Sequence, residues 1–291
     1  MNRLTFLPLS WKAVVLLATL NVLGLSISWG QLVPNLGGER AGVSGFTFLK
    51  TDLSPRAAAM AGAQNSVSGD GYAGNWNPAA LADLQYPTFA FANTFWIDGI
   101  NHGFFSFVHP TKRMGTIGLV AQTLATPAME RRTELQPNGT GEYFYASNTA
   151  IGLTYSKLLT DKFSYGATLK YVNENLDGFI AQTALVDVGF LYRVGFKDLQ
   201  FAVNLMHFGL NSKLDGDRNL NPFARDIRLE SYPSPSVFSM GLSMVPWKNE
   251  GDKSQLLTVL QVNHPSDNSA NIRAGLEYSF RQLLFLRAGY K

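Results

Sequence analysis

Apolar and polar residues alternate strictly along the chain from Thr88 to the C-terminus, in about eleven segments. The segment 163–171 is typical: every second residue from Phe163 is apolar or aromatic, and serine, glycine, threonine and lysine lie between. Successive side chains of a β-strand point to opposite faces, so each segment has one apolar and one polar face. A membrane-spanning strand shows these faces to lipid and to the lumen. The pattern predicts an all-β fold, an antiparallel outer-membrane β-barrel formed by residues 88–291.

The connections between the predicted strands are alternately short and long. Short turns are expected at residues 110–114, 160–162, 195–198, 248–253 and 281–282, and mostly longer loops at residues 127–144, 173–178, 210–235 and 264–269. Bacterial outer-membrane barrels have short turns on the periplasmic side and longer loops outside. The first strand therefore starts on the periplasmic side, and residues 31–87 lie on that side or inside the barrel.

Residues 31–87 do not alternate and contain two signals for the start of a helix. Ser54-Pro55 supplies an N-cap and a proline in the first turn of a helix that can end at Gly62. Asn77-Pro78 is a second pair of the same kind. Both signals precede runs rich in alanine, which predict short helices of small bulk. We expect residues 31–87 to form a plug, or hatch, folded into the lumen.

The first 30 residues predict a secretory signal peptide. Arg3 and Lys12 lie before or at the start of the apolar run 13–27, and a small-x-small site follows at residues 28–30. The run is shorter than the roughly 20 residues of a spanning helix, so a retained N-terminal anchor is the lesser alternative. Cleavage before Gln31 reduces the 24 basic residues to 22, against 21 acidic residues. This balance gives no reason to expect nucleic acid as a partner.

Catalysis and cofactors find no support in the sequence. The chain has no cysteine, which excludes disulfides and thiolate metal sites. Its four histidines are scattered and match no metal-ligand spacing, and no Gly-x-Ser-x-Gly motif occurs. We therefore expect no enzymatic activity and assign no catalytic, metal or cofactor residue.

Five charged residues occupy lumen-facing positions of the predicted strands. They are Lys170, Asp187, Arg273, Glu277 and Arg287. A buried charge without a partner is strongly unfavourable, so each of them needs an opposite charge or water. Small barrels fill their interiors, which favours a network of ion pairs between wall and plug. Arg56 is the plug-side member, paired with a lumen carboxylate such as Glu277 or Asp187. A permeation path through the lumen is the alternative.

Three runs in the N-terminal region resemble the signature of the PorV/PorQ family, relatives of the FadL long-chain fatty-acid transporter. The runs are residues 45–50, 54–63 and 75–81, and they lie within residues 31–87, about a fifth of the chain. They contain the plug motif residues Arg56, Met60, Gly62, Asn75, Asn77 and Pro78. Ala61 stands where many relatives carry a second glycine.

The resemblance implies a barrel of 14 strands with an internal N-terminal segment. It also implies a place beside a type IX secretion system, with secretion-system proteins or secreted cargo as partners in addition to outer-membrane lipid and lipopolysaccharide. FadL itself implies the alternative, transport of a hydrophobic small molecule across the outer membrane. The predicted lumen is more polar than a fatty-acid pocket requires, which favours docking.

Two further expectations concern the strand count and the longest loop. Eleven strands fall short of 14, and bacterial single-chain barrels have even numbers, so we expect about three strands beyond Lys291. A miscount, or a hairpin hidden in a long loop, is the alternative. The loop 210–235 is the longest connection and is the candidate docking loop, with Phe223, Leu229 and Tyr232 among arginine and aspartate residues.

Overall fold

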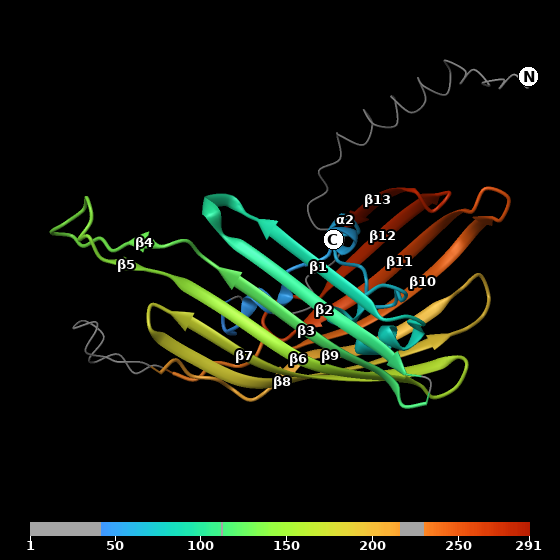
Figure 1. Ribbon diagram of the computed structural model, residues 1–291, viewed down its shortest axis with the longest axis horizontal. Coiled ribbons are helices and arrows are strands. Elements are labelled where there is room, and N and C mark those ends of the chain that lie inside the picture. The colour runs from blue at the N-terminus through green and yellow to red at the C-terminus, as the bar shows by residue number, and fades with distance from the viewer. Residues whose placement is uncertain (1–41, 112, 216–229) are drawn as a thin grey trace, which may run out of the picture. The chain divides into compact units, whose positions relative to one another are not determined.

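The computed structural model describes residues 42–111, 113–215 and 230–291. The predicted signal peptide, residues 1–30, lies outside this part of the chain. Within it, one antiparallel sheet of eleven strands dominates the fold, and each strand pairs with the next long strand along the chain (Figure 1). The predicted number of strands and their antiparallel arrangement are therefore confirmed.

The strands of this sheet are long enough to give each one several residues on both faces. They are β1 (Thr88–Phe95), β2 (Asn101–Thr111), β3 (Gly115–Ala125), β6 (Ala146–Leu158), β7 (Phe163–Leu176), β8 (Phe179–Arg193), β9 (Gln200–Gly209), β10 (Val237–Asn249), β11 (Ser254–Pro265), β12 (Asn271–Phe280) and β13 (Leu284–Tyr290). Among the described strands, β1 and β13 have one neighbour each and do not pair with one another. The sheet is thus open, and a closed barrel of 14 strands stays a prediction.

A small second sheet lies inside the loop between β3 and β6. It consists of β4 (Met129–Glu130) and β5 (Tyr143–Phe144), which pair antiparallel. Strands of two residues are too short to show alternation, which explains why the sequence predicted only a loop here. Figure 1 shows this hairpin extending well beyond the ends of the neighbouring strands.

Burial follows the predicted alternation on the large sheet. In β7, the side chains of Ser164, Thr168 and Lys170 are buried, whereas Leu169 and Tyr171 between and beside them are exposed. The buried positions face the plug and the exposed positions form the outer face. A period of two therefore separates the two faces as expected for a strand with one packed side.

The plug helices begin at the two predicted signals. In α2 (Pro55–Ala59), Ser54 Oγ accepts a hydrogen bond from the Ala57 backbone N–H at 3.3 Å. In η3 (Pro78–Asp83), Asn77 Oδ1 accepts one from the Ala79 N–H at 3.0 Å. The second helix is a 3₁₀-helix, a form that is common in short segments. The sequence did not predict the short 3₁₀-helices η1 (Thr47–Lys50), η2 (Ala73–Asn75) and η4 (Ile97–Gly99).

The core of the protein lies between plug and sheet. Phe46, Phe48 and Leu49 pack against strand residues such as Val172 and Leu185. Further along the plug, Leu53, Ala57 and Trp76 pack with Ala90 and Phe104, and Ala73, Ala80 and Leu81 pack with Val108. Burying these side chains away from water supplies the main stabilisation of the plug inside the sheet.

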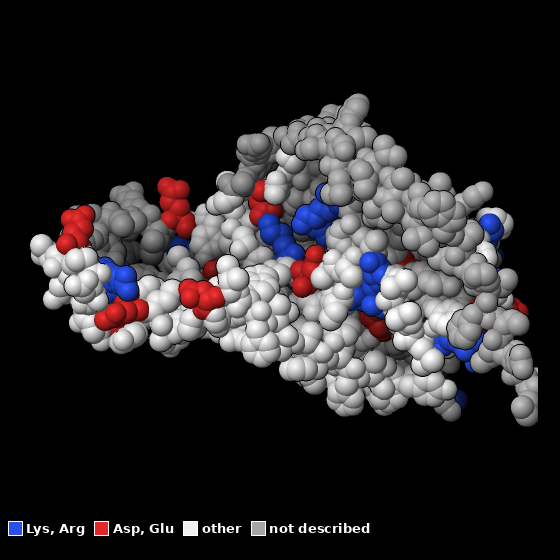
Figure 2. Space-filling model, turned by 90° about the horizontal axis from the view of Figure 1, so that it is seen from above, with Lys and Arg blue, Asp and Glu red and all other residues white. Residues whose placement is uncertain are grey.

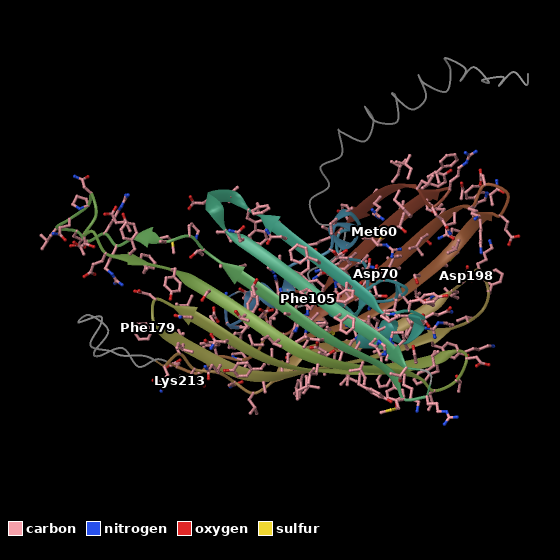
Figure 3. All side chains as sticks on the ribbon, in the orientation of Figure 1. Met60, Asp70, Phe105, Phe179, Asp198 and Lys213 are labelled. Carbon is pink, nitrogen blue, oxygen red and sulfur yellow. The ribbon has the colours of Figure 1, made fainter. Side chains whose placement is uncertain are left out.

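The plug runs from the long-loop end of the sheet to the short-turn end. Near its start, the Gly45 N–H donates to Pro233 O at 3.2 Å, in the loop between β9 and β10. Near its finish, Asp83 forms an ion pair with Arg193, where β8 ends at a short turn. Figure 3 shows Phe179 and Lys213 at the long-loop end, Asp198 at the short-turn end, and Met60 and Asp70 between them. No helix in the described ranges is both long enough and apolar enough to cross a membrane.

Candidate functional site

Glu277 on β12 is the centre of the largest charged cluster between plug and sheet. Arg56 of α2 approaches it with two donors, Nε to Oε2 and Nη2 to Oε1, both at 2.8 Å. Arg287, directly opposite on β13, donates from Nε to Oε2 at 2.6 Å. Asp70 of the plug lies 3.1 Å from Arg56 Nη1 and balances the second positive charge. The cluster joins two strands to two segments of the plug.

A second buried group lies on β7, β8 and β9. Lys170 Nζ is 2.6 Å from Asp187 Oδ2, and both side chains are almost fully buried. Asp187 Oδ1 also accepts a hydrogen bond from the His207 backbone N–H at 2.7 Å. The expected network between wall and plug is therefore divided: Glu277 pairs with Arg56 of the plug and with Arg287 of β13, whereas Lys170 and Asp187 pair within the sheet.

Strand alternation did not predict that His207 belongs to this group. The pairing of β8 with β9 shifts register between Val186 and Val188, so that Met206 and His207 both lie opposite Asp187. His207 has a φ of 56°, and both residues are buried. This is a β-bulge, which adds one residue to a strand and reverses the parity beyond it. A count of alternating positions cannot locate such a shift.

A third contact holds the start of the plug to the loop between β11 and β12. Lys50 Nζ lies 2.5 Å from Asp267 Oδ2, and the Ser44 hydroxyl donates to the same oxygen. Burial raises the pKa of Asp267, but hydrogen bonds from Lys50 and Ser44 and the charge of Lys50 outweigh it and hold the pKa below its usual value. The carboxylate is thus kept ionised at this loop.

Arg273 on β12 is the most weakly paired of the predicted lumen charges. Its Nη1 lies 3.8 Å from Asp52 Oδ1 and donates to Gly62 O at 3.4 Å. Its Nε donates to Asn271 Oδ1 at 3.3 Å. These long contacts leave the guanidinium with capacity for a further acceptor.

The remaining plug motif residues hold the plug in shape and against the sheet. Asn77 Nδ2 donates to Asn65 O at 2.9 Å and to Phe190 O at 3.2 Å. Met60 is fully buried, and Gly62 has a φ of 76° at the end of α2, a conformation that favours glycine. Pro78 follows the Asn77 cap at the first position of η3. Asn75 lines a cavity beside the plug.

That cavity, of about 260 Å³, lies between the plug and strands β9 to β12. From the plug it is lined by residues 49–52, Asn75 and Trp76. From the strands it is lined mainly by polar side chains, namely Asn204, His207, Ser239, Gln261, Asn263, Asn271 and Arg273. We call it the amide cavity, because six asparagine and glutamine side chains line it.

In the candidate docking loop, only Tyr232 of the three predicted residues lies within the described part of the chain; Phe223 and Leu229 lie outside it. The Tyr232 ring packs on Phe46 of the plug at a centroid distance of 5.9 Å. Burial, together with the nearby charge of Glu174, raises the pKa of Tyr232 to about 12. Tyr232 therefore attaches the loop to the plug and does not present a free ring to a partner.

The β4–β5 hairpin is the most exposed described structure at the long-loop end. Arg131 stiffens its base, with Nη2 2.5 Å from Asp177 Oδ2 and the guanidinium over the Phe144 ring. Tyr143, within this base, is exposed, and Leu135 beyond it is 94% exposed. Figure 2 shows further acidic and basic side chains together in a hollow of this face.

No protein-family model matches the chain, and no curated protein is significantly similar to it. A function for this protein therefore has to be argued from the contacts described above and from the sequence pattern.

Proposed function

We propose that the protein is an outer-membrane β-barrel component of the PorV/PorQ type that docks partners or cargo of a type IX secretion system. In this proposal the lumen is filled and the loops at one end make the contacts. The observation that carries it is the attachment of the plug to the sheet along its length, through Asp267, Glu277 and Arg193. A plug held at both ends and in the middle supports a scaffold more than a channel.

The outer face of the sheet supports a position in a bilayer. Its exposed side chains are large and apolar on many successive strands, for example Leu153, Leu169, Phe190, Leu260 and Leu276. A soluble protein rarely exposes a continuous apolar surface of this extent. An apolar outer face and a polar inner face are the arrangement expected of strands in an outer membrane.

The interior offers little to a hydrophobic substrate. The amide cavity is lined by asparagine, glutamine and charged side chains beside apolar ones such as Met206 and Val237, and a fatty acid would leave the polar groups without partners. The apolar side chains of the plug are already packed against the sheet. Transport of a hydrophobic compound would require these contacts to separate.

The long-loop end is the side that faces outward in this proposal, because long loops of such barrels are extracellular. There the β4–β5 hairpin exposes Leu135 and Tyr143 on a base stiffened by Arg131. Exposed aromatic and aliphatic side chains on a rigid support are typical anchors of protein interfaces.

The test replaces residues 133–139 at the hairpin tip with a short glycine linker and purifies the tagged full-length protein from its native membrane. We expect the sheet to stay folded, judged by its heat-dependent electrophoretic mobility, and the co-purifying secretion components or cargo to be lost. Phe196→Ser, an exposed aromatic at the opposite end, is the matched control and should retain them. Retained partners together with impaired uptake of a hydrophobic compound would instead support a transporter.

A further inference from the structure

The amide cavity has the size of a site for a small molecule. Its volume of about 260 Å³ is slightly below the roughly 300–1,000 Å³ of most small-molecule pockets. It extends toward the long-loop end, since Pro265 and Asn268 beside the β11–β12 loop belong to its lining. A ligand of one or two rings fits this space better than an extended acyl chain.

The lining chemistry is unusual in its content of primary amides. Six such side chains surround the cavity: Asn75, Asn204, Gln261, Asn263, Asn268 and Asn271. Thr51 and Ser239 add hydroxyl groups. Each amide offers both a donor and an acceptor, as does each hydroxyl group of a sugar. A ligand with many hydroxyl groups can therefore match this lining group by group.

Hydrogen bonds among the amides hold them in defined orientations. Gln261 Nε2 donates to Asn263 Oδ1 at 2.6 Å, and Asn263 Nδ2 donates to Asn271 Oδ1 at 3.1 Å. Gln261 Oε1 in turn accepts the backbone N–H groups of Gln64 and Asn65 of the plug, at 2.9 and 3.1 Å. Each amide nitrogen carries two hydrogens, and these contacts use one of them. The chain of amides is thus preorganised and still has donors available.

The polar lining is enclosed by the protein. Gln261 and Asn263 are both more than nine-tenths buried. The buried His207 also lines the cavity, with its Nδ1 atom 3.6 Å from Asp187 Oδ1. Buried polar atoms are normally satisfied by protein, water or ligand. Arg273, with its long contacts to Asp52 and Gly62, adds a cation at the same cavity.

We infer that the amide cavity is a binding site for a saccharide of one or two sugar rings. The amide chain from Gln261 to Asn271 recognises the hydroxyl groups, and Arg273 accommodates an acidic substituent where the sugar has one. The inference concerns the interior and does not depend on whether the hairpin docks a partner.

The test is titration calorimetry of the full-length protein in detergent. The probes are glucose, N-acetylglucosamine, glucuronic acid and their disaccharides, with glycine and palmitate as non-saccharide probes. We expect at least one saccharide to bind, and glycine and palmitate not to bind. Binding of glycine or palmitate alone, or of no probe at millimolar concentration, would overturn the inference and would indicate a cavity filled by water.

Substitutions of lining residues test whether the saccharide binds in the amide cavity. Asn271→Leu and Asn75→Leu remove lining amides at similar volume, and each should weaken saccharide binding about tenfold, since loss of one buried hydrogen bond to a ligand has roughly that effect. Asn173→Leu is the control, because Asn173 lies on β7 and does not line the cavity. Should Asn271→Leu fail to fold, Asn75→Leu on the plug decides alone. Equal affinity in a folded lining variant and the control would contradict the assignment.

Discussion

Glu277 shows how much can depend on a single residue in this protein. Its carboxylate accepts hydrogen bonds from Arg56 of the plug and from Arg287 of the neighbouring strand, while its side chain is almost completely buried. A buried carboxylate is tolerated only with such partners. Removing a partner therefore leaves a charge in a site that water barely reaches.

Arg56→Ala should loosen the plug. The change deprives Glu277 of its two contacts to the plug, and breaking a buried ion pair costs about 3 kcal/mol. We expect a lower melting temperature in detergent and faster proteolysis between residues 50 and 85. Arg281→Ala, in the exposed turn after β12, should change neither. Protection equal to that of the wild type would show that Arg56 does not hold the plug.

Acid should release the start of the plug from the β11–β12 loop. The pKa of Asp267 is lowered in the folded protein, so its contribution is present above the unfolded pKa of 3.8 and is lost as pH falls through the lower folded value. The protection factors of the amides of residues 44–50, which are corrected for the intrinsic exchange rate at each pH, should therefore stay high at pH 5 and fall below pH 3.8. Asp267→Asn should exchange faster already at pH 7 and respond less to acid. A variant as protected as the wild type would contradict this role.

Among the elements, η3 packs so closely against β7 that β7 has no room for a side chain at the contact. A Cβ atom at Gly166 would lie 2.5 Å from the backbone carbonyl carbon of Pro78, closer than atoms can approach. The helix is anchored there by the Asn77 cap and by its bonds to Asn65 and Phe190, so it cannot retreat freely.

Gly166→Ala should therefore displace η3 and reduce stability. Overpacking of a dense interior costs about 1–3 kcal/mol, which should appear as a lower melting temperature. Ala167→Val adds more volume one residue further along, but on the exposed face of β7, and serves as the control. An unchanged melting temperature for Gly166→Ala would mean that the plug is not packed on β7 in solution.

In the molecule as a whole, the two faces of the sheet differ in what must cover them. The inner face is covered by the plug, whereas the outer face exposes apolar residues on strands from β1 to β13. A bilayer satisfies such a face, and water does not. The proposal of a membrane protein can therefore be tested by single outward substitutions.

Leu169→Arg places a charge in the middle of the outer face of β7, where the side chain is 60% exposed. In a bilayer this substitution should destabilise folding by about 2–4 kcal/mol, and Tyr192→Arg near the strand end by only about 0–1 kcal/mol. Refolding from urea into phospholipid vesicles measures both. Equal and small effects at the two depths would argue that this face does not lie in lipid.

Much of this architecture follows from patterns that are local in the chain. The period of two identified the strands and the buried face of β7, because side-chain direction depends only on the backbone of the strand itself. The caps at Ser54 and Asn77 were equally predictable, since each helix start involves bonds across two or three residues. Lumen charges such as Glu277 could be assigned to a face, and Arg56 to a lumen carboxylate, with the choice between Glu277 and Asp187 left open.

The contacts that give the interior its properties required the folded chain. Arg56 and Glu277 are 221 residues apart, and only the folded chain shows that Arg56 pairs with Glu277 and not with Asp187. The bulge at His207 depends on how β8 and β9 pair, and it changes which residues are buried. The amide cavity arises where the plug leaves space beside β9 to β12. Such features depend on the register of distant strands and on the path of the plug, and these are settled only when all segments pack together.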